Sequence, residues 1–320
     1  MNFRRVFCTA ALIAALPFAS AQAQNRIVRV IVPYAPGGNI DVIARTFSKE
    51  LGELMEETWI VENVPGANGA IGTERVARSA PNGTTLLFSA DVHSMLPLVV
   101  KKVPYDPIKD FTPVALVAKA PLLFVVNAQK VKANDLKELV TEIQAAPANF
   151  TFAISGAGSS PQLAAEMFKV RTKLDLMSVN YKGTGPAVTD VAAGHVTMMA
   201  VTPLAALNLA RAGKLKALAV TSPTRFEGAP EIPTTAEAGM PGYEVLNSYG
   251  FWGPANLPAD QLARLSEAMR KTAQSAKMKQ RLLELGVMST WESPKDFEKH
   301  IVTEFDRNRK IYEGAGIKPE

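Results

Sequence analysis

Apolar and polar residues follow two different periods along the first part of the chain. Residues 27–32 form an almost continuous apolar run, typical of a buried strand, and the apolar positions of residues 40–54 recur at helical spacing. Residues 59–62 predict a second strand, residues 71–79 a helix and residues 84–89 a third strand. This βαβαβ order predicts a parallel sheet with helices on both faces.

The alternation of strands and helices begins again near position 150 and predicts a second α/β unit. Its expected strands are residues 150–155, 177–181, 196–201 and 215–221, and its expected helices are residues 161–170, 186–193 and 203–212. The rest of the chain is predicted to be mostly helical, with helices over residues 258–275 and 278–285 and a last one from Ser293. The pattern therefore indicates an α/β fold built from two units.

Four glycine-rich turns stand where a predicted strand leads into a predicted helix. They span residues 32–41, 62–72, 155–161 and 181–186. The first turn of a helix leaves about four backbone N–H groups unpaired and carries partial positive charge, and glycine lets a ligand approach the backbone. One such turn could be explained by the backbone freedom of glycine alone. Since the arrangement recurs, and such turns share the carboxyl edge of a sheet, we expect them to bind an anion.

The N-terminus has the features of a secretory signal peptide over residues 1–23. Two arginines precede an apolar stretch and a small-residue cleavage pattern, so the mature chain is expected to begin at Gln24. The single cysteine, Cys8, lies in this leader, which excludes disulfide, zinc–cysteine and cysteine-nucleophile chemistry for the mature protein. Loss of the two arginines lowers the formal charge from +5 to +3, which does not favour nucleic-acid binding.

The length of the mature chain predicts two domains, because removing 23 residues from 320 leaves 297. No later segment reaches the roughly 20 apolar residues of a transmembrane helix, and residues 111–127, which contain Pro113 and Pro121, are predicted to form two strands. We expect the chain to cross between the domains at residues 115–127 and again at residues 245–253, which would form a hinge. The expected first domain comprises residues 24–124 and 246–320, and the second comprises residues 125–245.

Five short stretches also occur in a specific order behind the leader. They are Pro36-Gly37-Gly38 with Asp41, Glu62 to Gly69, Asn82-Gly83-Thr84, Tyr181-Lys182-Gly183 with Pro186 and Asp190, and Pro233-Thr234 with Glu237-Ala238-Gly239. In this order they resemble the periplasmic solute-binding receptors of tripartite tricarboxylate transporters, the TctC or Bug family, over essentially the full length. The resemblance implies a two-domain periplasmic binding fold, type II-like, with two crossing hinge strands and an interdomain cleft.

The same resemblance implies a function. A receptor of this family would capture a small carboxylated solute, such as a dicarboxylate, an amino acid or a related organic acid, and deliver it to a tripartite tricarboxylate-type membrane transporter. The alternative is a ligand-sensing protein that signals to a membrane histidine kinase. Either function places the protein in the periplasm without a cofactor, and we expect it to be a monomer. His195 and His300 are isolated from other metal ligands, so no metal site is expected.

The turns and the resemblance together predict a set of ligand-binding residues. These are Tyr34, Gly37, Gly38, Asp41, Asn68, Ala70, Ser89, Asp91, Ser94, Ser155, Gly158, Ser159, Tyr181, Gly183, Thr184 and Asp190.

Some of these residues also have a structural interpretation. Asp41 is favourable on the dipole of the first helix whether or not it touches a ligand. Asp190 could meet a ligand ammonium or anchor a neighbouring loop. An acid and a histidine at positions 91 and 93 are less typical of the family, and Asp91 and His93 could instead face solvent or pair with each other. Lys182 is expected to point away from the site, because it follows an inward Tyr181 on a strand.

Enzyme motifs are absent from the sequence. There is no G-x-S-x-G elbow, no P-loop and no H-E-x-x-H, and residues 156–158 lack the third glycine of the dinucleotide fingerprint. The serines of the third turn would need a nearby base to act as nucleophiles, and three scattered histidines offer little support. The protein is therefore predicted to bind its ligand without catalysis.

Overall fold

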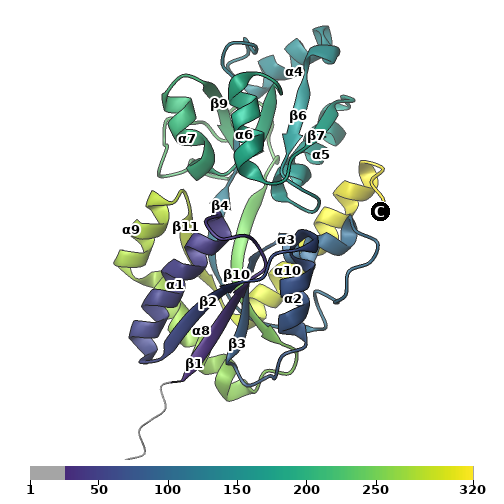
Figure 1. Ribbon diagram of the computed structural model, residues 1–320. Helices are drawn as coiled ribbons and strands as arrows, with labels where there is room; N and C mark the ends of the chain where they lie inside the picture. Colours follow the sequence, from purple (N-terminus) through teal and green to yellow (C-terminus); the bar gives the residue numbers. More distant parts are fainter. Residues whose placement is uncertain (1–25, 320) are drawn as a thin grey trace, which may run out of the picture.

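The computed structural model describes residues 26–319, and the predicted signal peptide lies outside them. The chain forms two α/β bodies, which appear as the lower and upper halves of Figure 1. The first body contains a six-stranded sheet of order β11-β4-β10-β3-β1-β2, and the second contains a five-stranded sheet of order β7-β6-β8-β5-β9.

The first body begins with the βαβαβ unit that the sequence predicts. Its elements are β1 (Ile27–Val32), α1 (Asn39–Met55), β2 (Thr58–Asn63), η1 (Ala67–Gly69), α2 (Ala70–Ala77) and β3 (Thr85–Ala90). Strand β1 pairs in parallel with both β2 and β3. Two short helices follow, α3 (Val92–Met95) and η2 (Leu96–Leu98).

The rest of the first body comes from the chain's middle and its C-terminal part. It comprises β4 (Phe111–Pro121), β10 (Leu246–Pro254), α8 (Ala259–Gln274), α9 (Ala276–Glu284), β11 (Met288–Glu292) and α10 (Pro294–Gly314). Strand β10 runs antiparallel to β3 and β4, and β11 runs antiparallel to β4. The sheet is therefore mixed rather than purely parallel, because β10, which returns from the second body, and β11 run opposite to the other four strands.

Helices cover both faces of this first sheet. Helices α1, α8 and α9 bury one face, where Phe47, Phe88 and Phe251 form an aromatic cluster with ring centroids 4.7–6.5 Å apart. Helices α2 and α10 cover the other face, on which Trp252 packs against Phe297 with ring centroids 4.9 Å apart. Helix α10 also packs against α5 of the second body, and Figure 1 shows it reaching upward at the right.

The second body contains the elements between the two crossings. They are β5 (Leu123–Asn127), α4 (Leu136–Ala145), η3 (Pro147–Asn149), β6 (Thr151–Ile154), α5 (Ser160–Thr172), β7 (Met177–Asn180), α6 (Thr184–Ala193), β8 (Met198–Val201), α7 (Pro203–Arg211) and β9 (Leu215–Val220). Strand β6 is parallel to β7 and β8, whereas β5 is antiparallel to β8 and β9. Helix α4 and strand β11 have no counterpart among the elements that the sequence predicts.

The buried residue Thr221 forms hydrogen bonds to both of the segments that cross between the bodies, beyond the end of the direct pairing of β4 with β10. Its hydroxyl accepts a hydrogen bond from the Leu122 N–H at 2.8 Å and donates one to the Val245 carbonyl at 2.6 Å. Its own backbone N–H donates to the Leu122 carbonyl at 2.9 Å, and its carbonyl accepts from the Val245 N–H at 3.2 Å. Leu122 separates β4 from β5 and Val245 precedes β10, so Thr221 extends the connection between the two crossings past the last β4–β10 pair.

None of the helices between residues 26 and 319 combines the length and the apolar character required to span a bilayer.

Candidate functional site

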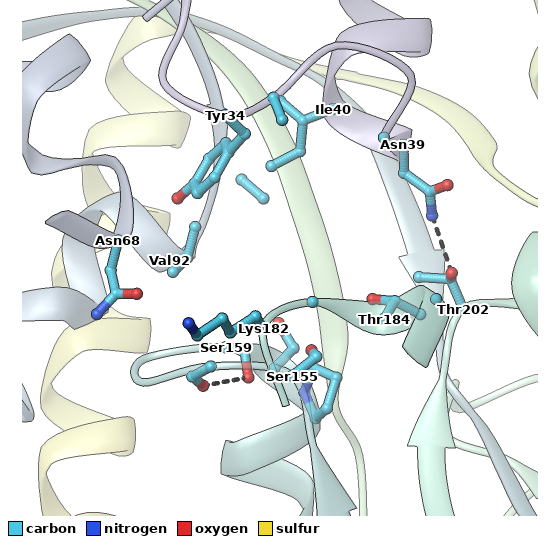
Figure 2. A pocket seen from close by; sticks show the side chains of 18 of the residues that line it. Tyr34, Asn39, Ile40, Asn68, Val92, Ser155, Ser159, Lys182, Thr184 and Thr202 are labelled. Atoms are coloured by element: carbon cyan, nitrogen blue, oxygen red, sulfur yellow. Dashed lines mark hydrogen bonds between the residues drawn. The ribbon is translucent and has the colours of Figure 1, made fainter. Parts of the chain in front are cut away.

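A cavity of about 1030 Å³ lies between the two bodies. Figure 2 shows it from close by, with side chains from the loop after β1 and from α1, η1 and α3 of the first body facing side chains of the second. The loops that line it follow β1 and β2 in the first body and β6, β7 and β8 in the second. The cavity therefore lies at the carboxyl ends of these strands, where open α/β sheets bind ligands.

Four helices begin at this cavity. The N-cap residues of α1, α5, α6 and α7 are Gly38, Ser159, Gly183 and Thr202, and all four line it. The helices are 17, 13, 10 and 9 residues long, so each carries a developed dipole with its positive end toward the cavity. At α1, α6 and α7 no side chain caps the first turn. The arrangement favours a bound anion.

The turn at the start of α1 already contains one negatively charged group of the protein itself, the carboxylate of Asp41. The Asp41 carboxylate accepts hydrogen bonds from the Gly37 N–H at 2.9 Å, from Arg45 Nε at 3.1 Å and from Asn63 Nδ2 at 2.9 Å. Burial opposes ionisation, but these hydrogen bonds outweigh it, and the pKa of Asp41 lies below its ordinary value. Asp41 lines the cavity but is fully paired, and the Gly37 N–H is not available to a ligand.

Gly38 differs from Gly37 in its backbone conformation. Gly37 has φ +86°, which favours glycine, whereas Gly38 has φ −77° and an added Cβ would meet only the Ala35 carbonyl at 3.9 Å. Gly38 therefore leaves the approach to the first turn of α1 open without being needed for the turn itself.

The second glycine-rich turn supports the aromatic wall of the site. Gly69 has φ +95°, and a Cβ there would lie 2.9 Å from the Tyr34 hydroxyl, so only glycine lets the ring pack in this place. Tyr34 and Asn68 line the cavity, and Figure 2 shows both side chains at one side of it. Ala70 does not line it, because it is buried within the first turn of α2.

The third turn places Ser155 and Ser159 at the cavity. The Ser159 hydroxyl donates to the Gly156 carbonyl at 2.7 Å and accepts from the Gln162 N–H at 3.3 Å, so it holds its own loop. Gly158 does not line the cavity, and its N–H donates to Gln162 Oε1 at 2.8 Å. The sequence could not foresee this bond, because a glutamine side chain at N3 has several conformations.

The fourth turn brings Tyr181, Gly183 and Thr184 to the cavity but leaves Asp190 outside it. The Tyr181 hydroxyl donates to Asp190 at 2.8 Å, and His195 Nδ1 lies 3.3 Å from the same carboxylate. The hydrogen bond from Tyr181, followed by that from His195, lowers the pKa of Asp190. Burial and this contact with Asp190 raise the pKa of Tyr181 to about 12. Of the two interpretations of Asp190, the geometry supports the anchor.

Three predicted residues between positions 89 and 94 do not reach the cavity, which their neighbours Ala90 and Val92 line instead. Ser89 is fully buried, and the Ser94 hydroxyl donates to the Asp91 carbonyl at 2.8 Å. The Asp91 carboxylate turns toward β10 and accepts the Ser248 N–H at 2.8 Å. Burial raises the pKa of Asp91 to about 7, although the Ser248 N–H and the nearby His300 oppose this shift.

His93 neither faces solvent nor pairs with Asp91. It is 2% exposed and lies in an aromatic box, with ring centroids 4.6 Å from Trp252, 5.0 Å from Phe111 and 5.9 Å from Tyr105. Burial lowers the pKa of His93 to about 3, so the ring is neutral at physiological pH. His93 is part of the core, so the alternative in which it faces solvent or pairs with Asp91 is wrong.

Lys182 lines the cavity, contrary to the prediction that it points away. The argument from strand alternation fails because β7 ends at Asn180, so Lys182 lies in the loop rather than on the strand. Sequence reasoning also missed six residues with hydroxyl or amide side chains that line the cavity, which are Asn39, Ser160, Asn180, Thr202, Asn247 and Tyr249. Asn39 and Thr202 stand at helix starts, so the residues flanking each predicted N-terminus were the available signal.

Two side-chain hydrogen bonds connect distant parts of the chain around the cavity. Asn39 Nδ2 of the first body donates to Thr202 Oγ1 of the second at 2.8 Å, as the dashed line at the right of Figure 2 marks. Ser160 at the start of α5 donates to Asn247 on β10. No cluster of metal-ligating side chains occurs among residues 26–319.

Two α/β bodies, two crossing segments and a cavity at helix N-termini define the class of two-domain periplasmic solute-binding proteins. Residues 43–317 match the tripartite tricarboxylate transporter family receptor, TctC, and the chain belongs to this family. The BugT protein of Bordetella pertussis is 32% identical over 318 residues, which cover 98% of this chain and 96% of BugT.

Solved structures support the same assignment. Rpa4515 of R. palustris with adipate has a TM-score of 0.85 and 30% identity, covering 93% of this chain and 99% of that one. MatC of Rhodopseudomonas palustris with bound malate has a TM-score of 0.79 and 30% identity, covering 89% and 98%. The predicted family and fold are confirmed, and since the family consists of periplasmic receptors, the expectation of a binding protein rather than an enzyme is confirmed too.

Proposed function

We propose that this chain captures a small carboxylated solute in the cavity between its two bodies and delivers it to a tripartite tricarboxylate-type membrane transporter. The observation that carries the proposal is the convergence of four helix N-termini on one cavity, three of them without a side-chain cap. Main-chain N–H groups and helix dipoles recognise a carboxylate without a buried cation.

The strength of such a site is sufficient for a receptor. A helix N-terminus contributes about 0.3–1 kcal/mol toward an exposed anion and up to about 2 kcal/mol when the anion is partly buried. Four such ends give up to about 8 kcal/mol, which corresponds to a micromolar Kd. Hydroxyl and amide side chains at the cavity, such as Tyr34, Asn68, Ser155 and Thr184, add hydrogen bonds that select among acids.

The relatives support an organic acid as the ligand. Rpa4515 holds adipate and MatC holds malate, both of which are dicarboxylates. This chain shares about 30% identity with each over most of its length. We infer that its ligand also carries at least one carboxylate.

The two bodies are proposed to act as the two domains of a closing cleft. The proposed first domain comprises residues 24–124 and 246–320, the second comprises residues 125–245, and the contacts of Thr221 form the pivot between them. A ligand that touches both domains favours closure, because it binds the closed arrangement more tightly than the open one.

A thermal-shift screen tests ligand capture. Adipate, malate and glutamate are compared with adipamide, which keeps the length of adipate but has no ionised group. An acid at 100 times its Kd stabilises the protein by about 2.7 kcal/mol, and adipamide is expected to give no shift. Equal shifts with adipamide and adipate would contradict an anion site.

Uptake measurements test delivery. Cells that lack this protein are expected to lose uptake of the acid that stabilises it. Unchanged uptake, together with altered gene expression in response to the acid, would favour the sensing alternative.

A further inference from the structure

Only two side chains of the types that are charged at neutral pH, Asp41 and Lys182, are among the described residues that line the cavity. The Asp41 carboxylate is neutralised by Arg45, with Nη2 3.0 Å from Oδ1, and by the hydrogen bonds from Gly37 and Asn63. Lys182 is exposed, and within residues 26–319 its ammonium has neither a hydrogen-bond nor an ion-pair partner. The cavity therefore contains one charge that the protein itself does not balance, and this charge is positive.

The place of Lys182 sets it apart from the uncapped helix ends. Figure 2 shows its side chain extending over the loop of Ser155 and Ser159, toward the side of the cavity where Asn68 lies. Asn39, Thr184 and Thr202 lie on the opposite side, where α1, α6 and α7 begin. The cavity thus has two polar sides, one with the ammonium and one with helix N-termini.

Apolar groups from both bodies also line the cavity. Ile40 and Val92 of the first body line it, as do Leu204 and Ala205 of the second. These side chains suit a hydrocarbon spacer, because they offer it an apolar surface and no hydrogen-bond partners. A ligand with an acid group at each end of such a spacer matches both sides at once.

We infer that Lys182 is a specificity-determining residue that makes this cavity prefer ligands with two ionised acid groups over ligands with one. Its ammonium binds one acid group, and the N-termini of α1, α6 and α7 bind the other. This inference rests on the proposed function, since it assigns the second acid group of a carboxylated ligand. A lysine has a flexible stem and a compact charge, so it can follow the distal acid group over a range of spacer lengths.

The experiment compares diacids with monoacids of equal carbon number by calorimetric titration. The probes are succinate, glutarate and adipate against butanoate, pentanoate and hexanoate. The variants are Lys182→Gln, which removes the charge, and Lys182→Arg, which keeps it. Lys214→Gln is the matched control, because Lys214 is also an exposed lysine of the second body but does not line the cavity. Both Lys182 substitutions are at an exposed position and are expected to leave the melting temperature unchanged.

The wild type is expected to bind the best diacid at least tenfold more tightly than its matched monoacid. In Lys182→Gln this preference should fall below threefold through loss of diacid affinity, while Lys182→Arg and Lys214→Gln keep it. The preference should also weaken as salt rises, because screening reduces the attraction between partly exposed charges.

The titrations separate a failure of the proposed function from a failure of the inference about Lys182. A wild type that binds none of the six acids overturns the proposed function, and the inference with it. A wild type that binds acids without a diacid preference, or a Lys182→Gln variant that keeps the preference, overturns the inference alone.

Discussion

Asn39 Nδ2 donates a hydrogen bond to Thr202 Oγ1 over 2.8 Å, which joins the first residue of α1 to the N-cap of α7. The two residues are 163 positions apart and belong to different bodies. The bond therefore joins the two bodies at the cavity and holds two of its helix N-termini close together.

Removal of this bond should weaken ligand binding more than it weakens the fold. Asn39→Ala is expected to reduce the affinity for the bound acid about fivefold, because a hydrogen bond of this kind contributes about 1 kcal/mol. Titration calorimetry checks this, with the exposed Asn149→Ala as control. In the double variant with Thr202→Val the two losses should not add, whereas full additivity would show that the residues act independently.

A side chain at Gly38 is expected to reduce ligand affinity without destabilising the turn. Gly38→Val should lower affinity at least tenfold, about 1.4 kcal/mol, because the side chain stands at the approach to the first turn of α1. The melting temperature of the unliganded protein should change little, since Gly38 has φ −77° and an added Cβ has room. Gly37→Val is the contrasting variant: its φ of +86° predicts a clear loss of stability. Normal ligand affinity in Gly38→Val would show that the acid does not approach there.

The pKa of Asp91, which burial raises to about 7, makes stability depend on pH. The folded protein keeps this proton up to about pH 7, whereas the unfolded chain releases it near the ordinary value of 3.8. Between these values the folded state binds more protons, so the contribution of Asp91 to the free energy of unfolding falls as pH rises from about 4 to about 7 and is level above. Asp91→Asn removes the charge and keeps an acceptor for the Ser248 N–H.

Asp91→Asn should therefore be more stable than the wild type at pH 8, by no more than about 4 kcal/mol. The two proteins should converge near pH 4. Urea unfolding at several pH values measures the difference, and the exposed Asp175→Asn is the control. A variant that is less stable than the wild type at pH 8 would show that the carboxylate is ionised and favourably bound.

Among the side-chain groups of Thr221, the hydroxyl rather than the methyl group is expected to provide most of the contribution to stability. Thr221→Val keeps the shape but leaves the buried Leu122 N–H and Val245 carbonyl without the partners that the hydroxyl supplies, at about 1–3 kcal/mol each. Thr221→Ser keeps the hydroxyl and should retain most of the stability. Urea unfolding separates the two variants, and equal losses would assign the effect to the methyl group and its packing.

The sequence predicted the fold in considerable detail, because its signals are local. The apolar period and the glycines placed β1, β2 and β3 within one or two residues and located all four helix starts around the cavity. Strand β11 was missed because it is a short edge strand whose residues are all partly exposed, so it has no continuous apolar run. Antiparallel pairing in both sheets follows from the crossings, which no local period encodes.

The sequence was less informative about which groups face the cavity. Whether a turn amide is free depends on nearby side chains, and Asp41 and Gln162 take the N–H groups of Gly37 and Gly158. The direction of Asp91 is set by Ser248, which lies 157 positions away. Such contacts form only when distant segments pack together.

Because the proposed acid site is formed by converging helix N-termini, receptors of this design can change their preferred ligand while they keep carboxylate binding. The groups proposed to hold an acid are main-chain amides, which are present whatever the side chain, so substitution within these helices does not remove them. Substitution of cavity residues such as Ile40, Val92, Lys182 or Leu204 can then change which acid is preferred, while the cavity still binds a carboxylate. A duplicated gene could therefore acquire a new solute in single steps, without passing through a form that binds nothing.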